Sequence, residues 1–249
     1  MTLLALLLFG PTVGKPPADW KLSPFYKKCI MLEGLPIISS DKVSDRALEE
    51  AYRLAKIMLA RIPEARKELI RQKVRIAVMA VSEQTLDIPE HSDLQRVFPQ
   101  TDWNKRARGL GPTAERPAIS AAEENLLRLP GDRYRGESIF IHEFSHAIME
   151  MGLGPVRKGF LNEVKSCYDQ AMKEKLWAKT YAATNPSEYW AEAVQSYFDC
   201  NMIVDPPNGI HNDVASPEKL KAYDPRVYRL IESVFGPNPY RWRNDPLRP

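Results

Sequence analysis

The chain has few cysteines, few histidines and no long hydrophobic run. Its 249 residues include three cysteines, Cys29, Cys167 and Cys200, which are too few and too widely spaced for a disulfide scaffold or a structural zinc site. If the protein is secreted, one disulfide with one thiol left over is an open alternative to three separate buried thiols. The cysteines therefore decide neither a pairing nor a compartment.

The chain also lacks a strong charge of either sign. It has 35 Lys and Arg residues against 32 Asp and Glu residues, a net charge of +3, and the basic residues are spread along the chain. Because no basic run provides a phosphate-binding stripe, we expect no nucleic-acid partner. The length, the 44% hydrophobic content and the absence of repeats predict a single globular unit, without setting an oligomeric state.

The N-terminus reads Met-Thr-Leu-Leu-Ala-Leu-Leu-Leu-Phe-Gly, an apolar run that has the length of a signal-peptide core but is too short to span a bilayer. No Lys or Arg precedes the run, and Thr12 and Gly14 offer an approximate cleavage site before Lys15. We expect residues 1–14 to be a signal peptide of a secreted or extracellular protein without a transmembrane segment. A buried N-terminal strand or a misassigned chain start would instead fit a cytoplasmic protein.

Residues 11–24 carry four prolines among polar residues, and we interpret residues 15–24 as an extended lead-in to a single domain at residues 25–249. Hydrophobic periodicity within this domain predicts helices and one buried strand. The predicted helices cover residues 44–59, 63–69, 137–151, 160–177, 187–199 and 225–235, and the strand covers residues 74–81. Residues 82–135 have little periodicity, and we expect a short strand there beside the substrate cleft. This pattern predicts a helix-rich α+β fold with a small sheet.

One polar cluster interrupts the apolar segment at residues 139–150. His142, Glu143 and His146 form a His-Glu-x-x-His motif, in which positions four apart share a helix face and can bind one metal ion. A chance pair of histidines on an exposed helix is the alternative, but the surrounding apolar residues predict a buried helix. Buried histidines beside a carboxylate need a metal or another partner. We therefore predict one catalytic Zn²⁺ ion held by His142 and His146, with Glu143 as the base that takes a proton from water.

A catalytic zinc usually has three protein ligands. The extended motif His-x-x-Gly-x-x-His is absent, and neither His91 nor His211 has motif spacing, so a carboxylate on a later helix is expected. Glu188 and Glu192 are four residues apart and share one face of a largely apolar helix, where two carboxylates need a nearby positive charge. Either can be the ligand, and we favour Glu188, with Glu192 orienting a metal ligand from behind.

A second interpretation explains Glu188 without any metal. Asn185 can cap the helix, Pro186 suits its first position, and Glu188 then completes a capping box. Spacing alone does not separate this capping role from metal binding.

These segments resemble the catalytic domain of anthrax-lethal-factor-like metallopeptidases, within the gluzincin group that includes thermolysin. His-Glu-Phe-Ser-His is followed by Tyr-x-x-Thr-Asn-x-x-Glu-Tyr-Trp-Ala-Glu, and the likeness covers residues 137–200. The chain is also similar to a broad set of uncharacterised proteins that carry this domain. The resemblance implies a zincin-like fold, Glu188 as the third ligand, Glu192 beyond the ligands, and Tyr181 as a donor to the oxyanion. On composition alone, Tyr181 would be a core aromatic residue.

The expected activity is cleavage of peptide bonds by zinc-activated water, with a peptide or protein as substrate. Glu143 removes the proton from water and delivers it to the leaving amine, while Tyr181 hydrogen-bonds the developing oxyanion. Two alternatives stay open: a non-catalytic zinc-containing binding or structural module on the same fold, and an amidase that acts on a non-peptide substrate. An intact Glu143 favours catalysis, because metal binding alone does not require it.

Overall fold

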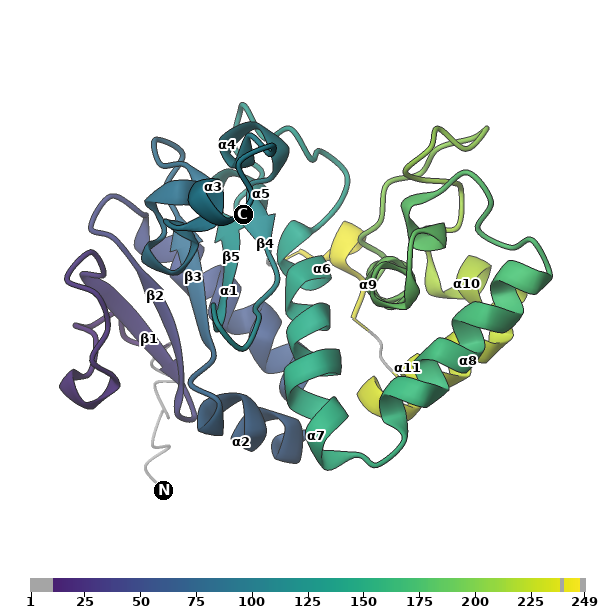
Figure 1. Cartoon of the computed structure of the whole chain (residues 1–249), viewed down its shortest axis with the longest axis horizontal. Helices are drawn as coiled ribbons and strands as arrows, with labels where there is room; N and C mark the ends of the chain where they lie inside the picture. The colour runs from purple at the N-terminus through teal and green to yellow at the C-terminus, as the bar shows by residue number, and fades with distance from the viewer. Residues whose placement is uncertain (1–10, 238–239, 247–249) are drawn as a thin grey trace, which may run out of the picture.

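The computed structural model describes residues 11–237 and 240–246, which form one sheet and a set of helices around it (Figure 1). The sheet has the strand order β1-β2-β3-β5-β4. Its strands are β1 (Lys28–Leu32), β2 (Leu35–Ser39), β3 (Arg75–Met79), β4 (Gly109–Leu110) and β5 (Ala118–Ala122). Strands β2, β3 and β5 are parallel, whereas β1 and β4 pair antiparallel with their neighbours at the two edges.

Helices make up most of the remaining regular structure. They are α1 (Asp45–Leu59), α2 (Pro63–Arg71), α3 (Leu94–Val97), α4 (Trp103–Arg106), α5 (Glu123–Leu126), α6 (Ile139–His146), α7 (Gly154–Val156), α8 (Phe160–Lys173), α9 (Pro186–Tyr197), α10 (Pro217–Tyr223) and α11 (Pro225–Phe235). Figure 1 shows the sheet on one side of the molecule and α8, α10 and α11 on the other, with α6 and α9 between them. The predicted α+β class with a small sheet is confirmed.

Helix α6 packs against both β5 and α9, so it lies at the centre of the molecule. Strand β5 reads Ala-Ile-Ser-Ala-Ala and is fully buried, and its four small side chains let the helix approach the sheet closely. On the helix itself, Phe140, Ile141 and Phe144 are buried in the main core. The centre of the fold therefore fixes the position of the segment that carries the two motif histidines.

The β1–β2 hairpin is absent from the sequence prediction. Its two-residue turn consists of Glu33 and Gly34, whose φ angles are 46° and 97°. Positive φ at both central positions suits the right-handed twist of a hairpin, and a glycine adopts it without strain. The turn was a readable signal, but β2 is buried along its whole length and β1 is exposed only at Met31 and partly at Lys28, so neither strand alternates as a half-exposed hairpin does.

Most predicted elements are confirmed, with changes at their ends. The helix predicted to begin at residue 137 begins at Ile139, because the Ser138 hydroxyl caps it by accepting a bond of 3.3 Å from the Ile141 amide. After His146 the chain continues as a π-helix, Ala147–Leu153, labelled η4. The helix predicted to reach residue 177 ends at Lys173, and the turn after it contains residues with positive φ. Helix α10 was not predicted.

The segment before β1 is packed onto the domain. Gly14 and Cys29 form an antiparallel bridge, with hydrogen bonds of 2.9 and 2.8 Å, and a 3-10 helix, η1 (Ala18–Trp20), interrupts the expected extended lead-in. Regular pairing thus begins before Phe25. Residues 1–10 of the expected signal peptide lie outside the described residues, so the signal stays a prediction.

All three cysteines are free thiols, with Cys29 and Cys200 buried. The disulfide left open by the sequence is not formed. Among the described residues, the helices are all too short or too polar to cross a bilayer.

Candidate metal centre

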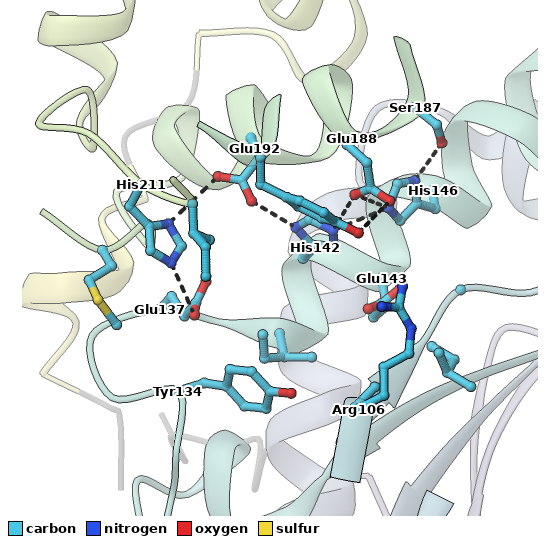
Figure 2. A pocket seen from close by; sticks show the side chains of 18 of the residues that line it. Arg106, Tyr134, Glu137, His142, Glu143, His146, Ser187, Glu188, Glu192 and His211 are labelled. Atoms are coloured by element: carbon cyan, nitrogen blue, oxygen red, sulfur yellow. Dashed lines mark hydrogen bonds and ion pairs between the residues drawn. The ribbon is translucent and has the colours of Figure 1, made fainter. Parts of the chain in front are cut away.

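Three side chains from two packed helices converge beside the sheet (Figure 2). His142 and His146 extend from α6, and Glu188 extends from the first turn of α9. The Nε2 atoms of the two histidines are 3.2 Å apart, and Glu188 Oε2 lies 3.1 Å from His142 Nε2 and 3.4 Å from His146 Nε2. Within the described part of the chain, this is the group whose donor atoms are close enough to hold a metal ion.

The far nitrogen of each imidazole faces a hydrogen-bond acceptor. His142 Nδ1 is 2.8 Å from Gln195 Oε1. The orientation of the Gln195 amide is set by its NH₂ group, which donates to Glu137 Oε2 at 3.3 Å and to the Ser138 carbonyl at 3.2 Å. The amide oxygen is therefore the atom that faces His142, and Nδ1 of the ring carries the proton.

His146 follows the same pattern through a different partner. Its Nδ1 is 2.8 Å from the hydroxyl oxygen of Ser187, and that hydroxyl donates to Glu150 Oε1 at 2.6 Å. Because the Ser187 proton is used by Glu150, the oxygen accepts from Nδ1–H of His146. Because Nδ1 of each ring is used in this way, Nε2 is the atom of each ring that can bind a metal, and it faces Glu188 and the other ring.

This arrangement fits a divalent metal. Two nitrogen lone pairs and a carboxylate oxygen that face one another repel unless a cation lies between them, and one proton can relieve only one of the three contacts. In a tetrahedral zinc site with bonds of about 2.0–2.1 Å, neighbouring ligand atoms lie about 3.3–3.4 Å apart. The measured separations of 3.1, 3.2 and 3.4 Å are close to this spacing.

The close approach of these side chains also shifts the pKa values of His142 and Glu188. Burial lowers the pKa of His142, but the hydrogen bond to Glu188 and the surrounding carboxylates outweigh it and raise the pKa to about 10. Burial raises the pKa of Glu188, but the two histidines outweigh it and hold the pKa far below its usual range. Without a metal, the site therefore binds a proton between these two groups, and a metal must displace it.

Glu188 does not form the capping box that the sequence allows. The Asn185 side chain caps α9 alone, accepting bonds of 2.9 Å from the amides of Ser187 and Glu188. The Glu188 carboxylate instead turns toward the histidines, with Oε1 3.3 Å from the hydroxyl of Tyr181. Helix packing between α6 and α9 therefore places this carboxylate beside the histidines and not at the cap.

Glu192 lies on the opposite side of His142 from Glu188. Its Oε1 is 3.7 Å from Nδ1 of His142, whereas Glu188 faces Nε2. The other oxygen of Glu192 accepts a bond of 2.8 Å from Asn201 and lies 3.8 Å from Nδ1 of His211. Because a ring binds a metal through one nitrogen, Glu188 and Glu192 cannot both contact a metal held by Nε2 of His142.

Glu143 borders the cavity beside the motif histidines (Figure 2). Burial raises the pKa of its carboxyl group, while the two histidines and the backbone of Gly111 oppose the rise. Gly111 lies very close: a Cβ there would be 3.3 Å from Glu143 Oε2 and 3.3 Å from His146 Cβ. The absence of a side chain at residue 111 therefore lets the end of β4 approach the motif.

Tyr181 begins the 3-10 helix η5 (Tyr181–Ala183) just before α9, and its hydroxyl reaches the cavity. Burial raises the pKa of the phenol, the charge of Glu188 raises it further, and the charge of Arg106 and a hydrogen bond to it lower it. The hydroxyl is therefore protonated near neutral pH and can donate a hydrogen bond.

These groups line a cavity of about 610 Å³ between the sheet edge and α9. Its walls also contain residues that the sequence did not single out as functional. Those with polar side chains near the three converging groups are Tyr134, Glu137, Glu150, Ser187 and Asn208. His211, which lacks motif spacing, lies there between Glu137 and Glu192, at 3.6 and 3.8 Å. His91 is buried elsewhere, with Nε2 3.0 Å from the Ser120 hydroxyl.

Gln195 is the most informative residue that the sequence reasoning missed. It lies seven residues after Glu188 and three after Glu192, which places all three on one face of α9. That spacing was a usable signal. Ser187 and Glu150 offered none, because their contact depends on how α9 lies against the π-helix after α6.

No protein-family model and no curated protein matches this chain. Among solved structures, the chain is similar to the Pro-Pro endopeptidase PPEP-2 from Paenibacillus alvei, with 17% sequence identity and a TM-score of 0.45. That likeness covers 81% of this chain and 97% of the PPEP-2 chain. At this identity and TM-score the likeness decides nothing about activity, so the side chains of the metal centre must carry the functional conclusion.

Proposed function

We propose that the chain is a zinc-dependent peptidase with a zincin-like, gluzincin-type site, in which His142, His146 and Glu188 hold one zinc ion. The observation that carries this proposal is the convergence of two imidazole Nε2 atoms and one carboxylate oxygen, each 3.1 to 3.4 Å from the next. Gln195 and Ser187 support it, because they fix the tautomer that a metal needs. Two nitrogens and one carboxylate oxygen are a ligand set typical of catalytic zinc.

A zinc ion held there would polarise a carbonyl group and lower the pKa of water at the site. Glu143 is the residue placed to take the proton from that water, since it follows His142 directly and its carboxylate reaches the cavity. Partial burial raises its pKa, which makes it a better base than an exposed glutamate. The same carboxyl group then delivers the proton to the leaving amine.

Tyr181 is proposed to stabilise the oxyanion of the reaction. Its hydroxyl lies 3.3 Å from Glu188 Oε1 and is protonated near neutral pH, so it can donate to negative charge that develops beside the Glu188 carboxylate. The contact with Glu188 holds the hydroxyl at the cavity before a substrate arrives. A phenylalanine at this position would fill the same space without the donor.

A peptide or protein substrate is favoured by the position of β4. This strand is the last in the sheet order, and residues 109–112, which contain and follow it, line the cavity next to Glu143 and His146. Among the described residues, no strand pairs with its outer side, and an extended peptide can add to such an edge through main-chain hydrogen bonds. A bond held along β4 would lie next to the proposed base.

Glu143→Gln tests the proposal directly. The variant should bind zinc as the unchanged protein does, while its chelator-sensitive cleavage of a diverse peptide library falls by about a hundredfold or more. Zinc content by mass spectrometry and peptide products by chromatography measure the two properties separately. Full activity in the variant would remove Glu143 as the base.

Two other results would identify the alternative functions. Stoichiometric zinc with no cleavage of any peptide would indicate a binding or structural module. Chelator-sensitive hydrolysis limited to non-peptide amides would indicate an amidase.

A further inference from the structure

Two arginines line the cavity beside the metal centre. Arg106 ends α4, and Arg133 lies in the loop between α5 and α6; both side chains are exposed and border the space that contains His142 and Glu143. Figure 2 shows the Arg106 guanidinium directed from the sheet side toward Glu143. Both groups therefore offer N–H donors to whatever occupies the cavity.

Neither arginine has a carboxylate within ion-pair distance among the described residues, and Arg106 is unusual in this respect. Every other Lys or Arg between residues 96 and 116 has such a partner: Arg96 and Arg116 pair with Asp93, Lys105 with Asp102 and Arg108 with Glu124. The contrast with Arg108 is the sharpest, because its guanidinium is buried in a two-bond pair with Glu124, at 2.6 and 2.8 Å. Among the Lys and Arg residues of this segment, the one without a carboxylate partner, Arg106, is the one that points into the cavity.

Four of the five carboxylates that line the cavity already have other partners, and the fifth, Glu143, forms no ion pair with either arginine among the described residues. Glu188 faces the two histidines, Glu192 accepts from Asn201, Glu137 accepts from Gln195, and Glu150 accepts from Ser187. None of them neutralises Arg106 or Arg133. The two guanidinium groups are thus free to bind an anionic group from outside the chain.

Both guanidinium groups are held in place without a counter-ion. Arg133 Nη1 donates to the Lys105 carbonyl at 2.8 Å, and its guanidinium lies 5.4 Å from the centre of the Tyr134 ring. The Arg106 guanidinium lies 5.8 Å from the centre of the Trp103 ring. Because Lys105 immediately precedes Arg106, the bond from Arg133 brings the two arginines to the same end of α4.

Arg106 also reaches the reaction site. Its charge lowers the pKa of Tyr181, so the two side chains are neighbours, and the Tyr181 hydroxyl contacts Glu188 Oε1 at 3.3 Å. An anionic group bound by Arg106 would therefore lie within a few residues of a peptide bond held at the metal centre. A planar guanidinium fits a carboxylate through two parallel N–H bonds.

We propose that Arg106 and Arg133 form a carboxylate-binding subsite, and that the preferred peptide substrate carries a carboxylate close to the bond that is cleaved. This inference rests on the proposed peptidase function and adds the class of substrate. The carboxylate can come from an Asp or Glu side chain or from the C-terminus of the peptide. A guanidinium group binds either kind of carboxylate through the same hydrogen bonds.

The test uses the full chain loaded with zinc and a set of short acetylated peptides of Ala, Leu and Ser. One Glu is moved along the peptide, each Glu peptide has a Gln twin, and every peptide is made with both a free acid and an amide at its C-terminus. Cleavage is measured on the unchanged protein, and binding is measured by calorimetry on the Glu143→Gln variant. At the best position, the carboxylate form should be bound or cleaved about tenfold better than its neutral twin.

Arg106→Gln and Arg133→Gln should each reduce that preference several-fold, and Arg106→Glu should remove or reverse it. Lys105→Gln is the matched control: it removes one positive charge from the same helix, but Lys105 pairs with Asp102 outside this cavity, so the preference should remain. Comparing Glu with Gln peptides, and free-acid with amide peptides, identifies whether a side-chain or a C-terminal carboxylate is recognised.

The outcomes separate this inference from the function on which it rests. Chelator-sensitive cleavage with equal use of Glu and Gln peptides, or with a preference that Arg106→Gln and Arg133→Gln leave intact, overturns the subsite and leaves the peptidase standing. Preferential binding of carboxylate peptides that depends on Arg106, without any cleavage, supports the subsite and overturns the peptidase. Absence of both binding preference and cleavage overturns both.

Discussion

Nδ1 of His142 lies 2.8 Å from Oε1 of Gln195, a contact between two helices that joins residues 53 positions apart. The Gln195 amide is itself held by the Glu137 carboxylate and the Ser138 carbonyl, so it cannot turn its NH₂ group toward the ring without losing both bonds. A fixed acceptor at Nδ1 keeps Nε2 directed at the proposed metal position. Gln195 thereby links the packing of α6 and α9 to the chemistry of the site.

Gln195→Ala should weaken zinc binding by about ten- to a hundredfold, because the ring loses the acceptor that fixes its tautomer and orientation. Competition with a chromophoric chelator measures the affinity. Gln170→Ala is a suitable control, since Gln170 is on α8 and bonds only to the exposed Glu174. Equal zinc affinity in the Gln195 variant and the unchanged protein would show that this contact does not support the metal.

Gly111→Ala should reduce turnover by about ten- to a hundredfold while the protein still folds, because the added Cβ forces Glu143 or His146 to move by a few tenths of an ångström. The Cβ would lie 3.3 Å from Glu143 Oε2 and from His146 Cβ. Steady-state kinetics and the thermal midpoint of unfolding measure activity and stability separately. Unchanged turnover in the Gly111 variant would mean that β4 does not position the proposed base.

His91 should make the protein less stable in mild acid. Burial is the main cause that lowers its pKa from 6.5 to about 4, so the folded protein resists a proton that the unfolded chain accepts. The stabilising contribution is complete above pH 6.5 and is lost as the pH falls through 6.5 toward 4. The total loss corresponds to about 3 kcal/mol of unfolding free energy.

Urea unfolding of the unchanged protein and of His91→Asn, at a series of pH values with a chelator present, measures this contribution. The difference between the two unfolding free energies should shrink as the pH falls, because only the unchanged protein has this titration. A difference that stays constant with pH would show that protonation of His91 does not cause the loss of stability in acid.

Local patterns in the sequence were sufficient for most helices. The bounds of α11 follow from Asp224, Pro225 and Gly236, which mark its two ends. An aspartate directly before a helix usually caps it, but Asp224 does not. Its carboxylate makes no cap bond and instead accepts from Tyr189 at 2.7 Å and from Trp177 at 3.2 Å inside the core. The sequence pattern located the end of the helix but could not show which long-range partners its first residue would meet.

The candidate metal centre likewise has one part that the sequence could predict and one part that depends on tertiary packing. The His-Glu-x-x-His spacing was enough to place His142, Glu143 and His146 on one helix, because i and i+4 positions share a face. The choice between Glu188 and Glu192 was not available from spacing, since both lie on the face of α9 that meets α6. It depends on which ring nitrogen each carboxylate faces, and that is fixed by the tertiary packing of the two helices.

The most direct measurement of the central claim is the zinc content of Glu188→Gln compared with that of Glu192→Gln. The two substitutions are chemically identical and lie one turn apart on α9, so their effects on the helix itself should be similar. The unchanged protein should contain one zinc ion per chain, Glu192→Gln should retain most of it, and Glu188→Gln should lose most of it after dialysis against a weak chelator. Full zinc retention in Glu188→Gln, or loss confined to Glu192→Gln, would contradict the proposed metal centre.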